Sequence, residues 1–214
     1  MTWGDCKLIA LQRMFSVTTS DIPTDSTTME YIYAMPGAAN EALALLSTAG
    51  RYIVKSVQFS FSEPIIGTDG KEIQIPLSGL VHLPLSKLTD DFYLLDEDQL
   101  YYEEGDSFYS VTDFNMEGED ILLLPRSAGG TFTAYYFAYP PEITQSTNDN
   151  YELPLLPEVA VLVPLYIGSQ LYKEDDVSIA AQLRNEFEVG REELKNRMKN
   201  RSGVVSFRSV TGWI

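Results

Sequence analysis

The sequence predicts an α+β protein in which the N- and C-terminal segments form a helical bundle and an antiparallel β-sandwich or barrel domain is inserted between them. Two observations lead to this fold class. Apolar residues recur at helical spacing near both ends of the chain, whereas the middle shows alternating apolar and polar residues together with turn dipeptides. We therefore divide the 214 residues into N-terminal helices (1–50), an inserted β domain (51–150), a C-terminal helical hairpin (151–200) and an extended tail (201–214).

The C-terminal hairpin carries the strongest helical signal, because it combines a long apolar run with few turn residues. We expect a first helix from Pro157, where a missing N–H costs nothing, with a kink near residue 160 caused by Pro164. An acidic turn ends this helix and supplies Asp175 or Asp176 as the cap of the next one. The second helix has a single apolar stripe, formed by Ala180, Leu183, Phe187, Gly190, Leu194 and Met198.

The N-terminal segment also shows helical signals. A helix is expected over residues 3–15, with Thr2 or Asp5 as its N-cap. A short helix then runs through Tyr33, and Pro36 restarts the chain in a third helix whose alanine-rich face permits close packing. We expect these helices to dock on the C-terminal hairpin and complete the bundle.

Strand signals fill the middle region. From residue 53 to residue 61, apolar and polar residues alternate, which is typical of a strand with one buried face. The Asp69-Gly70 dipeptide lies between two isoleucine-rich stretches and predicts a hairpin turn. Further strands are expected over residues 80–83, 101–103, 108–111, 121–124 and 131–139.

One motif links the hairpin to a known family. PEVAVLVPLYIGSQLYKEDD, followed by AAQLRNEFE, describes an apolar helix that ends in an acidic turn and leads into a helix with an Asn-x-Phe element. Together with residues 3–15, residues 35–57 and the Tyr-Pro-Pro at 139–141, this motif resembles the head-to-tail adaptor (connector) proteins of tailed bacteriophages. The resemblance covers roughly half of the chain and includes no catalytic signature.

The resemblance implies a structural virion protein at the neck, where the head joins the tail. Such a protein forms a homo-oligomeric ring, with a dodecamer the expected form, and is assembled in the host cytoplasm. A portal protein and a tail or nozzle protein are the implied partners. DNA passes through the ring during ejection without specific binding. The resemblance implies the same layout of a helical bundle with an inserted β domain.

Charge narrows the classes of partner. The formal net charge is −16, and residues 51–150 hold 17 acidic and 5 basic residues, a net charge of −12. A surface of this kind repels nucleic acid, so the composition excludes a protein that binds DNA tightly. Two interpretations of the charge remain open: a solvated surface that confers solubility, or part of the lining of a channel in which DNA slides.

Compartment signals are few. No window of about 18 uncharged apolar residues occurs, and the N-terminus lacks a basic-then-apolar signal, so we expect a soluble, unsecreted protein without a membrane span. The single cysteine, Cys6, cannot form an internal disulfide, which favours folding in a reducing cytoplasm.

The residues that could act in catalysis or bind a metal are better explained by structural roles. His82 is the only histidine and lies on an expected strand, so a structural or surface role is favoured over that of a base. The acidic residues 96–98 begin like a calcium loop, but Leu100 and Tyr101 occupy positions that require an oxygen ligand and a glycine. The chain has no Cys/His cluster for zinc. We therefore expect no enzymatic activity, no cofactor and no metal.

Aromatic residues are unusually dense in the expected strands: Tyr101, Tyr102, Phe108, Tyr109, Tyr135, Tyr136, Phe137 and Tyr139. They fit either an ordinary sheet core or an exposed interface. The second possibility supports an alternative function, a tail-associated β-sandwich module that binds carbohydrate or protein.

The C-terminal tail changes character, because basic and apolar residues follow an otherwise acidic chain. We expect a subunit or portal interface formed by Arg191, Lys195, Arg197, Lys199, Arg201, Val205, Phe207, Arg208, Trp213 and Ile214. A free end that exposed Trp213 and Ile214 to water would be unfavourable, so the tail is expected to lie extended against another chain, with Trp213 as its anchor. The alternative is a tail that folds back on its own subunit.

Overall fold

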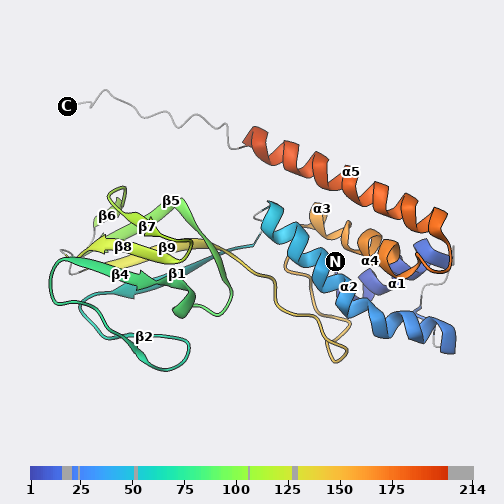
Figure 1. Ribbon diagram of the computed structural model, residues 1–214, viewed down its shortest axis with the longest axis horizontal. Helices are drawn as coiled ribbons and strands as arrows, with labels where there is room; N and C mark the ends of the chain where they lie inside the picture. Colours follow the sequence, from blue (N-terminus) through green and yellow to red (C-terminus); the bar gives the residue numbers. More distant parts are fainter. Residues whose placement is uncertain (16–20, 24, 51–52, 106, 127–129, 202–214) are drawn as a thin grey trace. The chain divides into compact units, whose positions relative to one another are not determined.

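A computed structural model describes residues 1–15, 21–23, 25–50, 53–105, 107–126 and 130–201. It contains helices and several antiparallel sheets, which confirms the α+β class (Figure 1). The chain forms two compact units. The helical unit comprises Met1–Ala42, Gln145–Leu153 and Pro157–Ile214, and the strand unit comprises Leu43–Thr144 and Pro154–Leu156.

The helices are α1 (Trp3–Phe15), α2 (Ser26–Gly50), α3 (Pro157–Ala160), α4 (Val163–Leu171) and α5 (Val177–Arg201). Side chains cap two of them as the sequence predicts. Thr2 and Asp5 exchange hydrogen bonds at the start of α1, from Thr2 N–H to Asp5 Oδ2 (3.0 Å) and from Asp5 N–H to Thr2 Oγ1 (3.1 Å). Asp176 Oδ1 accepts the N–H of Ser178 (2.9 Å) and of Ile179 (3.1 Å) at the start of α5.

The predicted break at Pro36 is wrong, because α2 runs without interruption through this residue. A proline inside a helix removes one backbone hydrogen bond. Met35 and Ala39 on either side are fully buried. The burial of this face offsets the lost bond, since tertiary packing rather than local propensity supplies most helical stability.

The predicted kink near residue 160 is instead a full interruption between α3 and α4. Val161 and Leu162 form a turn, and Pro164 lies in the first turn of α4. A proline in the first helical turn has no intrahelical N–H bond to lose, so it starts a new helix here rather than bending an existing one.

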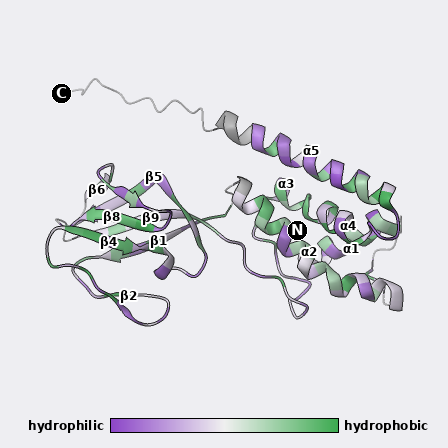
Figure 2. Ribbon diagram, in the orientation of Figure 1, coloured by the Kyte–Doolittle hydropathy of each residue, from purple (hydrophilic) through white to green (hydrophobic). Residues whose placement is uncertain are grey.

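In the helical unit, α1 and α5 both pack against α4. The largest fully buried side chains of the helical unit include Trp3, Leu11, Met14, Met35 and Phe187. Two glycines allow close helix contact: a Cβ on Gly168 would lie 2.7 Å from Leu183 Cδ1, and one on Gly190 would lie 2.6 Å from Leu162 Cδ2. Figure 2 shows that α3 and α4 are mainly hydrophobic, whereas hydrophilic residues recur along α5. The amphipathic α5 therefore covers the apolar α4.

In its described residues, the strand unit contains three antiparallel sheets. Its strands are β1 (Val54–Ser60), β2 (Ile65–Ile66), β3 (Glu72–Ile73), β4 (Leu80–Pro84), β5 (Phe92–Glu104), β6 (Ser107–Ser110), β7 (Asn115–Glu117), β8 (Ile121–Pro125) and β9 (Thr131–Ala138), with a short 3₁₀ turn at Leu85–Lys87. The sheet orders are β1-β9-β5-β6, β4-β8-β7 and β2-β3. Ile65 pairs with Ile73 across the Asp69-Gly70 turn, which confirms the predicted hairpin.

One hydrophobic core joins the four-stranded and three-stranded sheets. Phe59, Leu100 and Phe132 of the larger sheet and Leu83 and Leu122 of the smaller one belong to the same buried cluster. Along β9 every second residue is buried, so this strand has one face on the core and one face away from it.

Strand β5 differs most from the prediction, because it begins at Phe92 and not near residue 101. The pairing of β5 with β9 shifts in register between Leu95 and Leu100, so residues 96–99 bulge out of the ladder. The bulge contains the acidic residues 96–98. Because charged residues are rare in strands, these residues made the first part of β5 look unlike a strand in the sequence. Strand β7 was not predicted either.

Candidate functional site

The predicted basic interface begins on the last turns of α5. The guanidinium of Arg191 lies 2.6 Å from Glu188 Oε2 and 5.9 Å from the centre of the Phe187 ring. Lys195, one turn further on, has an exposed side chain. Cations near the C-terminal end of a helix are favoured by its dipole. Arg191 is thus held by its own helix, while Lys195 is open to solvent.

The other predicted interface residues lie beyond the described side chains. Arg197, Lys199 and Arg201 lie in α5, but the structure describes only their backbone. Val205, Phe207, Arg208, Trp213 and Ile214 lie outside the described residues. The interface that the sequence assigns to this set stays a prediction.

Three aromatic rings on neighbouring strands form what we call the aromatic row: Phe108 on β6, Tyr101 on β5 and Tyr135 on β9. The Tyr101 ring stacks on Phe108, with centroids 4.8 Å apart, and meets the Tyr135 ring edge-on at 5.9 Å. Tyr135 points away from the core, because its neighbours along β9 are the buried ones. Phe108 is 62% exposed. The row therefore presents aromatic surface that a partner could cover.

Other members of the predicted aromatic set belong to the core. Tyr136 is buried, and its hydroxyl donates to Asp91 Oδ1 at 2.9 Å. Burial raises the pKa of Tyr136, and the hydrogen bond to Asp91 adds to this shift. Burial alone would raise the pKa of Asp91 too, but hydrogen bonds from Lys55 and Tyr136 lower it below its usual value. Tyr136 thus belongs to the core, whereas the aromatic row lies away from it.

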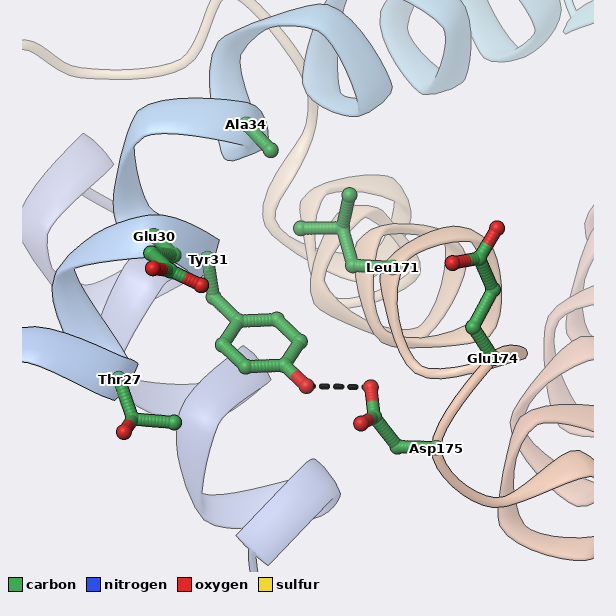
Figure 3. A pocket seen from close by; sticks show the side chains of 7 residues that line it. All are labelled: Thr27, Glu30, Tyr31, Ala34, Leu171, Glu174 and Asp175. Carbon is green, nitrogen blue, oxygen red and sulfur yellow. Dashed lines mark hydrogen bonds between the residues drawn. The ribbon is translucent and has the colours of Figure 1, made fainter.

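The helical unit also contains an acidic pocket of about 380 Å³ (Figure 3). Its lining consists of Thr27, Glu30, Tyr31, Ala34, Leu171, Glu174 and Asp175. Figure 3 shows the Tyr31 hydroxyl directed at the Asp175 carboxylate, to which it donates a hydrogen bond. No pattern in the sequence predicts this pocket, because Tyr31 and Asp175 are 144 positions apart.

Tyr31 provides a pH-dependent test of this contact. Burial and the hydrogen bond to Asp175 raise its pKa to about 12. A tyrosine whose pKa is raised on folding contributes stability below its unfolded pKa near 10, and this contribution is lost as the pH rises through about 12. We expect Tyr31→Phe to flatten the fall in urea midpoint between pH 9 and pH 12. Tyr33 is an exposed tyrosine of the same helix, so Tyr33→Phe is the matched control. If the urea midpoint of Tyr31→Phe fell with pH as steeply as that of the parent, the contact between Tyr31 and Asp175 would be contradicted.

The residues considered for catalysis or metal binding are surface features. His82 is exposed, and its Nδ1 lies 2.8 Å from Glu117 Oε2. Within the bulge of β5, the amide of Gln99 donates to Asp96 at 2.7 Å. Across the described parts of the chain, no group of three or more His, Cys, Asp or Glu residues is placed to hold a metal ion. No helix in those parts is long and apolar enough to cross a membrane.

The sequence matches a known protein family. A family model described as SU10 adaptor protein matches residues 8–208, nearly the whole chain. No curated protein matches the sequence. The matched range spans both the helical unit and the strand unit.

Proposed function

Because the chain belongs to the SU10 adaptor protein family, we propose that it is a ring subunit at the head-to-tail junction of a phage, where it docks beneath the portal and forms part of the DNA channel. The observation that carries this proposal is the family match over residues 8–208. The match confirms the resemblance to phage adaptors, which are structural proteins of the virion. Assembly of the ring in the host cytoplasm, before DNA ejection, is part of the proposal.

We further propose that the ring subunit is organised as a helical bundle with an inserted β-sandwich, with boundaries near residues 50 and 150 and an extended tail from residue 201. The composition of the helical unit supports this layout, because its segments come from both ends of the chain. The core shared by two sheets supports the sandwich. The portal would contact one side of the ring and a tail or nozzle protein the other.

A channel role suits the acidic middle of the chain. The net charge of −12 over residues 51–150 would weaken adhesion of phosphate to the ring and let the duplex slide. DNA would thus pass without specific binding. Retention of duplex DNA by the purified protein at physiological ionic strength would contradict this part of the proposal.

The basic α5 end and the tail are the proposed tether to a neighbouring subunit or to the portal, and removing residues 202–214 tests this role. We expect the truncated chain to keep its melting temperature, because the tail is proposed to contact another chain and not its own subunit. We expect it to lose incorporation into a larger particle when the portal protein is added, measured by mass photometry. A chain with residues 202–214 in scrambled order is the control for length and charge. Undiminished attachment of the truncated chain would show that the tail is not the tether.

A second function rests on the aromatic row. Exposed rings beside hydroxyl-bearing residues such as Thr133 and Ser110 also suit a tail-associated module that binds carbohydrate or protein. Mass measurement separates the two functions: an adaptor enlarges when the portal is added, whereas a glycan-binding module stays monomeric and binds sugar.

A further inference from the structure

We propose that the edge of β6 receives the C-terminal segment, residues 202–214, of a second copy of this chain as an added β-strand. The proposal rests on the proposed ring function and assigns an acceptor surface to the tail. It is carried by three features: the hydrogen-bonding groups of β6, the exposed side chains of this strand, and the composition of the tail.

The first feature is the free hydrogen-bonding capacity of β6. Among the described residues, β1 and β6 are the edge strands of the four-stranded sheet. Val111 N–H donates to Leu100 O at 2.8 Å, and the next pair along the ladder is Tyr101 with Ser110. Because bonded and non-bonded pairs alternate in an antiparallel ladder, the N–H and C=O of Ser110 and of Phe108 point away from β5. The N–H groups can donate hydrogen bonds to an added strand, and the C=O groups can accept hydrogen bonds from it.

The second feature is the contrast between the two edges. All four residues of β6 are exposed, and two of them are aromatic: Phe108 (62%) and Tyr109 (55%). The edge of β1 instead has one exposed apolar side chain, Val54 (48%), beside the polar Lys55, Ser56 and Gln58, and charged or polar residues protect an edge from pairing. An edge strand with two exposed aromatic rings invites pairing with another chain. β6 is therefore the edge of this sheet that fits a partner.

The third feature is the match between the tail and β6. The tail sequence, SGVVSFRSVTGWI, is rich in β-branched and aromatic residues and contains no proline, which suits an added strand. No acidic residue occurs after Glu193, so the tail is basic through Arg208. Glu103, Glu104 and Asp113, which are exposed beside β6, have the opposite charge. Main-chain bonds would supply affinity, and Phe207 or Trp213 could extend the aromatic row.

A second copy is the occupant that fits the proposed ring. In a head-to-tail ring, every subunit offers one donor surface and one different acceptor surface, and the contact repeats until the ring closes. The tail and β6 are two such surfaces, since one continues the chain after α5 and the other belongs to the strand unit. An extended segment of this length spans roughly 40 Å, which is enough to reach a neighbouring subunit.

The test titrates the full-length chain into a fluorescent peptide with the sequence of residues 202–214 and measures anisotropy. We expect saturable binding. Ser110→Pro removes an edge N–H of β6 and is expected to weaken binding at least ten-fold. Ser56→Pro removes the equivalent N–H from the other edge and serves as the matched control. Phe108→Ser, which leaves the backbone of β6 able to pair, is expected to weaken binding as well.

Each outcome decides the inference. Equal weakening by the two proline variants, or undiminished binding to both Ser110→Pro and Phe108→Ser, would overturn it. Lack of binding at concentrations at which the full-length chain is monomeric by mass photometry would also overturn it, because the edge would then be closed or filled by the tail of the same chain. If the peptide fails to bind while the full-length chain still forms a larger particle with the portal, the inference fails and the proposed function stands. If the peptide binds at β6 but the full-length chain forms no larger particle with the portal, the inference stands and the proposed function fails.

Discussion

Replacing Phe187 by alanine is expected to lower the free energy of unfolding by about 3–5 kcal/mol, the range found for removal of a buried aromatic ring. Phe187 is fully buried on α5, and its ring lies 5.0 Å from that of Tyr166 on α4. The guanidinium groups of Arg184 and Arg191 lie 5.5 and 5.9 Å from the same ring. The substitution would leave a cavity between α4 and α5 and remove both cation–π contacts. Urea denaturation followed by circular dichroism measures the loss.

Val189→Ala is the matched control for this prediction. Val189 lies two residues further along α5 and is 51% exposed. Its truncation removes little buried surface and is expected to change the free energy of unfolding by less than about 0.5 kcal/mol. If both variants unfolded at the same urea concentration as the parent, the packing of α5 on α4 would be wrong.

A charge in the core of the strand unit is expected to have an even larger effect. Leu83 on β4 is fully buried in the cluster that joins the two larger sheets. Leu83→Asp would place a carboxylate in this core, and its ionised form cannot be buried unpaired. We expect a loss of more than about 4 kcal/mol, a large share of the roughly 5–15 kcal/mol that stabilises a folded domain. Soluble expression and the thermal transition report the result.

The comparison for Leu83 comes from the same strand. Leu80 begins β4 and is 48% exposed, so Leu80→Asp introduces the same charge near water. We expect this variant to remain folded with a melting temperature close to that of the parent. A folded, soluble Leu83→Asp protein with an unchanged transition would show that β4 does not contribute to the core.

Local signals in the sequence were sufficient for much of the fold. The Asp69-Gly70 turn, the cap at Asp176 and the strand expected over residues 131–139 each depend on neighbours in the chain, and each prediction is confirmed. The same reasoning failed at Pro36 and in β5. At Pro36 the burial of Met35 and Ala39 outweighs the lost bond, and these contacts are not encoded in the adjacent residues.

The bulge of β5 shows a second kind of failure. Its acidic residues interrupt the apolar alternation, and they are compatible with a strand because the bulge takes them out of the ladder. Pairing with β9 supplies that geometry, and a partner strand that follows later in the chain cannot be inferred from local composition. The acidic pocket escaped notice for the same reason, since its walls come from α2 and from the turn after α4.

The candidate interface was only partly accessible to sequence reasoning. The basic α5 end and the tail stand out by composition, whereas the aromatic row depends on the register between β5, β6 and β9. Composition indicated that the aromatics were either core or interface. The alternation of buried positions then separated Tyr136 from Tyr135.

Because the helical unit is formed from both ends of the chain, its first helix is synthesised long before its last. Arg13 of α1 pairs with Glu186 of α5, 173 positions later. At the usual rate of about 5–20 residues per second, a ribosome needs roughly 10–35 s to extend the chain from one partner to the other. During this time the strands, which are contiguous, can pair and close their own core. Helix α1 meanwhile holds Trp3, Leu11 and Met14 without their partners, so the nascent chain is a natural client for a chaperone until α5 emerges.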